Sequence, residues 1–172
     1  KKCAEVGILA DLYLYNKDVT SKELEEKITE LNNDKSVTGI LLQLPIPEHL
    51  DEHFLINQIC PYKDVDGLTW YNIGRLSQGS YAIPPCRPKG VIELLDFYKI
   101  PIEGKDVLII NDSNIVGKPL AQLFLKKGAT ITIAHKKTTQ LKEKIHKADI
   151  ICTAVGIPNF LKDTDFYRGQ TI

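Results

Sequence analysis

The sequence predicts an α/β protein, because short apolar runs typical of buried strands alternate with helical segments along most of its 172 residues. The alternation is clearest between residues 106 and 154, where three strand-like runs enclose two helical segments. Alternation of this kind predicts a parallel sheet. A second observation is Gln43, a polar residue near the end of the apolar run Val37–Leu44. Open α/β sheets bind ligands at the carboxyl ends of their strands, so Gln43 stands where a ligand could bind. We expect two α/β domains.

The first half is predicted to contain two strands and two helices. Ile8–Tyr15 is rich in apolar and aromatic residues and predicts a strand. Val37–Leu44 predicts a buried parallel strand, because Asn and Asp residues precede this apolar run and prolines follow it. Ser21–Leu31 predicts an amphipathic helix with Ser21 as its N-cap. His49–Cys60 has apolar residues at helical spacing, and residues 61–90 are predicted to be mostly loop.

The second half begins with a predicted helix at Lys89–Tyr98, which places the domain boundary between residues 90 and 91. The remaining predicted elements are strands at Asp106–Asn111, Thr130–Ala134 and Ile150–Ala154, and helices at Val116–Lys127 and Leu141–Lys147. This order predicts a Rossmann-like nucleotide-binding domain at 91–172. The first residues resemble the middle of a helix without an N-cap, and the last resemble the start of a further strand. We therefore expect the sequence to be the ordered middle of a longer protein.

The composition is that of an ordinary globular protein, with 43% hydrophobic and 26% charged residues. A net charge of zero and a pI of about 7.1 give no support for a nucleic-acid partner. No run is long and apolar enough to cross a bilayer, and we expect no membrane partner. The four cysteines are far apart and predict neither a metal site nor disulfides, which favours a cytoplasmic or mitochondrial-matrix location.

Two segments carry polar residues of interest in the first half. Gln43 either faces a ligand or hydrogen-bonds a neighbouring loop. The turn Lys63–Gly67 places Asp64 and Asp66 close together, either as a solvated turn or as part of a site.

The segment Asn111–Gly117 joins a predicted strand to a predicted helix. A helix N-terminus at such a place can receive a phosphate. Ser113 and the backbone at Ile115 and Val116 are the expected donors, and Gly117 permits close packing of helix on strand. The alternative is a generic strand-to-helix turn without a ligand.

Four ordered motifs resemble those of the bifunctional methylenetetrahydrofolate dehydrogenase/cyclohydrolase family. They are Leu-Gln-Leu-Pro-Ile-Pro at 42–47, Lys-Asp-Val-Asp-Gly at 63–67, Pro-Cys-Arg-Pro-Lys-Gly at 85–90 and Asn-Asp-Ser-Asn-Ile-Val-Gly-Lys-Pro at 111–119. Their order and spacing are those of the family, and the resemblance covers essentially the whole chain.

The resemblance implies NAD(P)-dependent oxidation of 5,10-methylenetetrahydrofolate to the methenyl form, hydrolysis of that product to 10-formyltetrahydrofolate, and a homodimer. It implies that Gln43 tunes a catalytic lysine, which lies in a Tyr-x-x-x-Lys segment and would precede Lys1. It also implies that the two domains flank a cleft, where Asp66 binds the pterin ring in a slot lined by Leu44 and Pro45. Asp64, the other acid of the turn, is then expected to hold the turn. The cofactor residues that it implies are Cys86, Asn111, Ser113, Ile115, Val116, Gly117, His135 and Lys136.

The chain departs from the family pattern at two places. Asn111-Asp112 stands where the family usually has Gly-Arg, which removes a cation that typically binds the 2′-phosphate of NADP. Arg87 stands where the family usually has Thr. Lys136 and Lys137 offer positive charge at the ribose-reading position, so we expect NADP as cofactor with NAD also tolerated. The alternatives are a degenerate paralogue, a monofunctional dehydrogenase and a non-catalytic nucleotide-binding module.

Overall fold

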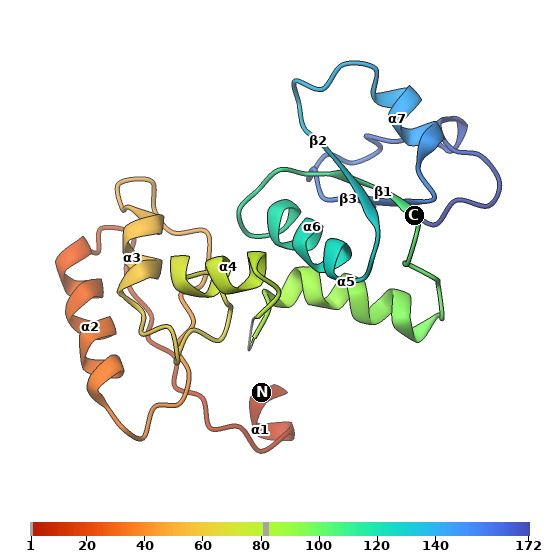
Figure 1. Cartoon of the computed structure of the whole chain (residues 1–172). Helices are drawn as coiled ribbons and strands as arrows, with labels where there is room; N and C mark the ends of the chain where they lie inside the picture. The colour runs from red at the N-terminus through yellow and green to blue at the C-terminus, as the bar shows by residue number, and fades with distance from the viewer. Residues whose placement is uncertain (1, 81–82) are drawn as a thin grey trace.

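The computed structural model describes residues 2–80 and 83–172; Lys1 and residues 81–82, which belong to the predicted first domain, lie outside the described residues. The chain is α/β, as predicted. Figure 1 shows α2 and α3 at one end of the molecule and the sheet at the other, with α4 between them and α5 below α6 and the sheet. The elements are α1 (Lys2–Glu5), α2 (Ser21–Asn33), α3 (Glu52–Gln58), α4 (Trp70–Ser77), α5 (Cys86–Phe97), β1 (Asp106–Ile110), α6 (Gly117–Lys126), β2 (Thr130–Ala134), α7 (Leu141–Lys147), β3 (Ile150–Thr153) and a 3-10 helix at Asp163–Asp165.

The sheet of the second half is parallel, with strand order β2-β1-β3. The central strand β1 is buried on both faces, which explains its continuous apolar sequence. Val107 and Ile109 point to the side of α5 and α6, while Leu108 and Ile110 pack with α7. The strands and helices predicted between residues 106 and 154 are confirmed, with ends that differ by at most one residue.

The first half has its own core, which gathers around α2 and α3. The helix α2 begins at Ser21, but its N-cap is Thr20 and not the predicted Ser21. The Thr20 hydroxyl accepts from the Glu23 N–H, and the Glu23 carboxylate accepts from the Thr20 N–H at 2.8 Å. This reciprocal pair outcompetes a Ser21 cap because it satisfies two backbone groups at once.

Both strands predicted in the first half are wrong. Residues 8–15 contain no strand, because no neighbouring strand among the described residues pairs with them, and Leu9 is fully exposed. Val37–Leu44 forms only an isolated parallel bridge between Ile40 and Asp64. Ile40 is buried but Leu41 is 52% exposed, so this segment has one buried face and not the two that the prediction required.

The helix boundaries around the centre of the chain also differ from the prediction. The predicted helix His49–Cys60 is limited to α3 because Asp51 caps its start by accepting from the Phe54 N–H at 3.0 Å. The described part of 61–90 is mostly loop, as predicted, but it also contains α4, capped by Thr69, and the start of α5, which the prediction missed. The helix α5 starts three residues before the predicted Lys89, because Pro88 lies in its first turn, where a missing N–H costs little.

Candidate functional site

The acidic turn at 63–67 is held by one buried carboxylate. Asp64 is 4% exposed and accepts hydrogen bonds from the N–H groups of Gly67 and Thr69, both at 2.8 Å. The Asn72 amide donates to the same carboxylate at 2.9 Å. Asp64 therefore holds the turn, as the sequence indicated. The sequence analysis did not identify Asn72 as the partner of Asp64. The signal for it was Thr69, an N-cap residue three positions before Asn72.

The turn packs directly on the segment that leads into α5. Gly67 has a φ of +67°, and a Cβ at this position would lie 2.6 Å from the carbonyl oxygen of Ile83. This contact brings the half-buried Asp66 close to Cys86, the first residue of α5. Partial burial raises the pKa of the Cys86 thiol, and the neighbouring Asp66 carboxylate raises it further. Asp66 and Cys86, predicted for two different ligands, are thus neighbours.

Gln43 lies on an exposed loop that follows the Ile40 bridge. Its amide donates to the Leu44 carbonyl at 3.0 Å, which is the one hydrogen bond that the described residues show for this side chain. The peptide bond between Leu44 and Pro45 is cis. Leu44 is half-buried, whereas Gln43 and Pro45 are exposed and available to a ligand.

The loop between β1 and α6 is ordered by its own side chains. The Asn111 side-chain oxygen accepts from the Ser113 N–H at 2.9 Å, the Ser113 hydroxyl at 2.7 Å and the Gly117 N–H at 2.9 Å. The Ser113 hydroxyl in turn accepts from the Val116 N–H at 3.1 Å. The described residues show no partner for the Ile115 N–H, which leaves it as a donor for an anion at the start of α6.

His135 and Lys136 follow β2 at the same edge of the sheet. Ile110 pairs with Ala134, so Asn111 and His135 both come directly after paired residues at the carboxyl ends of their strands. The His135 N–H donates to the Thr138 hydroxyl at 2.9 Å, and its ring Nδ1 accepts from the Lys137 N–H at 3.2 Å. The Lys136 side chain is exposed. The sequence analysis did not identify Thr138, whose side chain closes this turn.

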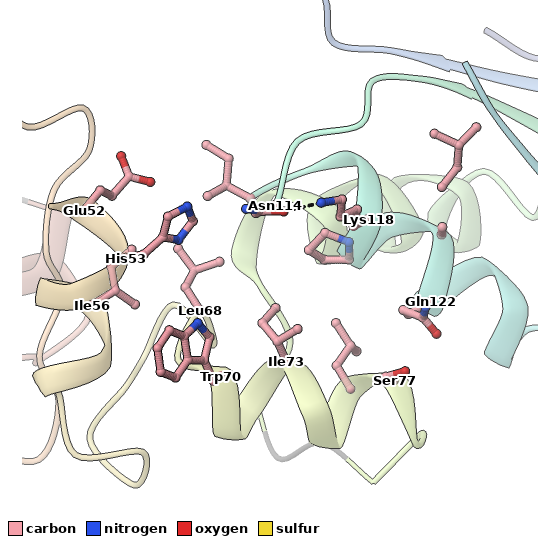
Figure 2. A pocket seen from close by; sticks show the side chains of 15 residues that line it. Glu52, His53, Ile56, Leu68, Trp70, Ile73, Ser77, Asn114, Lys118 and Gln122 are labelled. Carbon is pink, nitrogen blue, oxygen red and sulfur yellow. Dashed lines mark hydrogen bonds between the residues drawn. The ribbon is translucent and has the colours of Figure 1, made fainter. Parts of the chain in front are cut away.

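A cavity of about 450 Å³ lies between α3, α4 and α6. Figure 2 shows α3 on one side, α4 beneath and α6 on the other side, with the Lys118 ammonium donating to the Asn114 amide oxygen at 2.6 Å. Ile115 is the one predicted site residue on its wall. Gln43, Asp66, His135 and Lys136 are not among its lining residues, so the cavity does not contain these predicted sites.

The described residues contain no cluster of three or more His, Cys, Asp or Glu that could hold a metal ion. All four cysteines are free thiols, and burial raises the pKa of Cys152 to about 12. Of the helices in the described ranges, none has the length and apolar character needed to span a membrane.

Comparison with known proteins assigns both halves to one family. Residues 1–66 match the catalytic domain of tetrahydrofolate dehydrogenase/cyclohydrolase, and residues 85–172 match the NAD(P)-binding domain of the same family. The bifunctional protein FolD of Chlamydia abortus is 43% identical over 169 residues, which are 95% of this chain and 59% of that protein.

Solved structures show the same likeness. The FolD methylenetetrahydrofolate dehydrogenase/cyclohydrolase of Campylobacter jejuni has a TM-score of 0.95 and 42% identity, and the match covers 98% of this chain and 60% of that one. The Trypanosoma brucei dehydrogenase-cyclohydrolase, solved with NADP cofactor and inhibitor, has a TM-score of 0.93 and 30% identity over 98% of this chain and 58% of that one. The chain thus spans about 60% of the length of such relatives. It belongs to the tetrahydrofolate dehydrogenase/cyclohydrolase family.

Proposed function

We propose that the chain carries the folate and cofactor sites of a bifunctional enzyme. This enzyme oxidises 5,10-methylenetetrahydrofolate with a nicotinamide cofactor and hydrolyses the methenyl product to 10-formyltetrahydrofolate. The observation that carries the proposal is the packing of the acidic turn on α5, which puts Asp66 of the catalytic match beside Cys86 of the cofactor match. Folate and cofactor must meet for hydride transfer, and this packing joins the two parts that would bind them.

Asp66 is proposed as the pterin ligand, with Leu44 and Pro45 lining the slot. A half-buried carboxylate can accept two hydrogen bonds from the amino and ring N–H groups of a pterin, which specifies that ring. Because Asp64 takes the structural hydrogen bonds of the turn, Asp66 remains available for this contact. Gln43 is proposed to hydrogen-bond and tune the catalytic lysine, and its exposed amide is accessible to such a partner.

NADP is proposed as the cofactor, with NAD accepted less well; when bound, it supplies the carbon that accepts the hydride. The residues of the loop fit a dinucleotide, since Gly117 closes it tightly and the Ile115 N–H is without a partner among the described residues. The proposed cofactor residues are Cys86, Asn111, Ser113, Ile115, Val116, Gly117, His135 and Lys136. The Trypanosoma brucei relative, solved with NADP, supports this choice.

The function is tested by assays of both reactions and by the variant Asp66→Asn. Asparagine keeps the shape but places an amide N–H against the pterin donors, so folate affinity should fall by more than about tenfold, or about 2 kcal/mol. Affinity for NADP should remain within about threefold, because Cys86 is the one proposed cofactor residue that lies beside Asp66. An equal loss of both affinities would make Asp66 a purely structural residue.

Three further properties are proposed. A domain boundary between residues 90 and 91 would lie within α5, which is the connection between the two halves. A homodimer is supported by the large exposed side chains Leu9, Leu12 and Leu14, and light scattering tests it. A cytoplasmic location agrees with the four free thiols and can be tested by cell fractionation.

A further inference from the structure

We propose that Asn111 is a positioning residue that clamps the cofactor loop in its binding shape from within. The inference rests on the proposed function only in that the loop 111–117 is taken to bind NADP. In this role Asn111 acts on the loop and does not contact the cofactor, because the oxygen and the nitrogen of its side chain both bond groups of this chain.

The acceptor side of the carboxamide holds both ends of the loop. Its oxygen receives the N–H and hydroxyl of Ser113 and the N–H of Gly117, at 2.7–2.9 Å. One atom therefore gathers donors two and six residues ahead of it. The Ser113 hydroxyl then accepts from the Val116 N–H, which extends the same network to the residue before α6.

The donor side of the carboxamide ties the loop to the next strand. The Asn111 side-chain nitrogen donates to the carbonyl oxygen of Ala154 at 2.8 Å. Ala154 directly follows β3, which pairs with β1. Asn111 therefore ties the loop to the ends of β1 and β3 as well as to the start of α6.

The space around this carboxamide is closed. A Cβ on Gly117 would collide with the Asn111 carbonyl group and lie 2.8 Å from its side-chain oxygen. The loop therefore folds directly over Asn111.

The family motif usually has glycine at the position of Asn111. Glycine has no side chain to make these hydrogen bonds, so this chain holds its loop by contacts that the usual motif lacks.

The clamp also decides which donors remain for a phosphate. The Ser113 N–H and hydroxyl and the Gly117 N–H point inward, toward Asn111. The N–H groups of residues 112, 114 and 115 have no partner among the described residues. The phosphate donors of the loop are therefore drawn from these N–H groups, and Asn111 acts by holding that backbone in place.

Amide hydrogen exchange of the cofactor-free enzyme tests the clamp directly. In Asn111→Ala, the N–H groups of Ser113 and Gly117 should exchange about tenfold faster or more, as expected when a hydrogen bond of ordinary strength is lost. Asn114→Ala is the matched control, because that side chain bonds only the Lys118 ammonium and should leave both rates unchanged. Asn111→Asp keeps an acceptor oxygen and should retain the protection. Unchanged rates in Asn111→Ala, or equal acceleration in Asn111→Asp, would overturn the proposal.

Calorimetric titration with NADP gives the second readout. The dissociation constant should rise about tenfold in Asn111→Ala and stay within about threefold of wild type in Asn114→Ala. Equal affinities in Asn111→Ala and wild type would show that the clamp does not serve binding and would overturn the positioning role. A wild-type enzyme that binds no NADP, yet shows the exchange pattern above, would refute the proposed function while supporting the clamp.

Discussion

The Asn72 amide donates to the buried Asp64 carboxylate at 2.9 Å and to the Pro61 carbonyl at the same distance. This amide joins α4 to the acidic turn and to the residues that precede it. Burial alone would raise the pKa of Asp64, but the hydrogen bonds from Asn72 and Thr69 outweigh it and leave the pKa below its ordinary value of 3.8. The charged form of Asp64 is therefore the one that the fold stabilises.

This relationship predicts how stability depends on pH. Because the folded pKa is below the unfolded value of 3.8, the contribution of Asp64 is fully present above that pH and is lost as the pH falls through the folded pKa. Asp64→Asn should lower the free energy of unfolding near neutral pH by about 2 kcal/mol, since it removes charge-assisted hydrogen bonds in a buried place. The loss should shrink below pH 4, measured by urea unfolding at several pH values.

Asp112→Asn is the control for that experiment, because it makes the same charge change on an exposed side chain. Its unfolding curves should follow those of the wild type. If Asp64→Asn and the wild type lost stability in parallel on acidification, the ionised carboxylate would not be what holds the turn.

Gly117 and Gly74 form a matched pair for testing the cofactor loop. A Cβ on Gly117 would collide with Asn111, whereas a Cβ on Gly74 in α4 meets nothing within 4 Å. Gly117→Ala should destabilise the protein by about 1–3 kcal/mol through overpacking and weaken NADP binding. Gly74→Ala should stabilise it by about 0.5–1 kcal/mol, because alanine is the better helix former. Thermal unfolding and NADP titration of both variants check this, and equal effects would contradict it.

Lys136 is expected to select NADP over NAD. Its exposed ammonium follows β2, and attraction to a 2′-phosphate at about 4 Å is worth roughly 1–4 kcal/mol between the limits of bulk water and a protein surface. Lys136→Ala should therefore reduce the ratio of kcat/KM for NADP over NAD by about tenfold, with a weaker effect at high salt. Lys137→Ala is the control and should change the ratio less. A ratio that is insensitive to Lys136 would assign the phosphate to another group.

Gln43→Ala is expected to slow methenyl hydrolysis without destabilising the fold. If the amide tunes the catalytic lysine, methenyl hydrolysis should fall by about a hundredfold, the usual contribution of a positioned acid/base contact. The melting temperature should hardly change, because Gln43 is exposed and bonds only its neighbour. Gln78→Ala, another exposed glutamine, is the control. Hydrolysis within a few-fold of wild type would exclude this role.

The sequence predicted the second half of the fold far better than the first. β1 is a buried strand whose apolar run carries its own signal, and its neighbours follow at the strand–helix–strand spacing that predicts a parallel sheet. Val37–Leu44 has a similar run, but its pairing depends on a partner strand that local sequence does not reveal. α4 was missed because its signal is the Thr69 cap and a short apolar stripe within a Pro- and Gly-rich region.

The candidate site was predicted in part for the same reason. The motifs picked out Asp66, Cys86 and the β1–α6 loop as candidates, because each motif is a short continuous segment that can be recognised from local sequence. The partners that hold them in place come from elsewhere along the chain, as Asn72 does for Asp64 and Ala154 does for Asn111. Such pairings arise from packing, and no local pattern encodes them.

Trp70 stands on the wall of the cavity between α3 and α6, is 71% exposed, and is the only tryptophan of the 172 residues. Its backbone N–H is held by the Asn57 side chain, which fixes the start of α4 against α3. The chain therefore carries a single indole fluorophore, which lies between its two halves. Any change in the opening between them alters the hydration of this indole, so its emission wavelength reports the relative motion of the halves without a label.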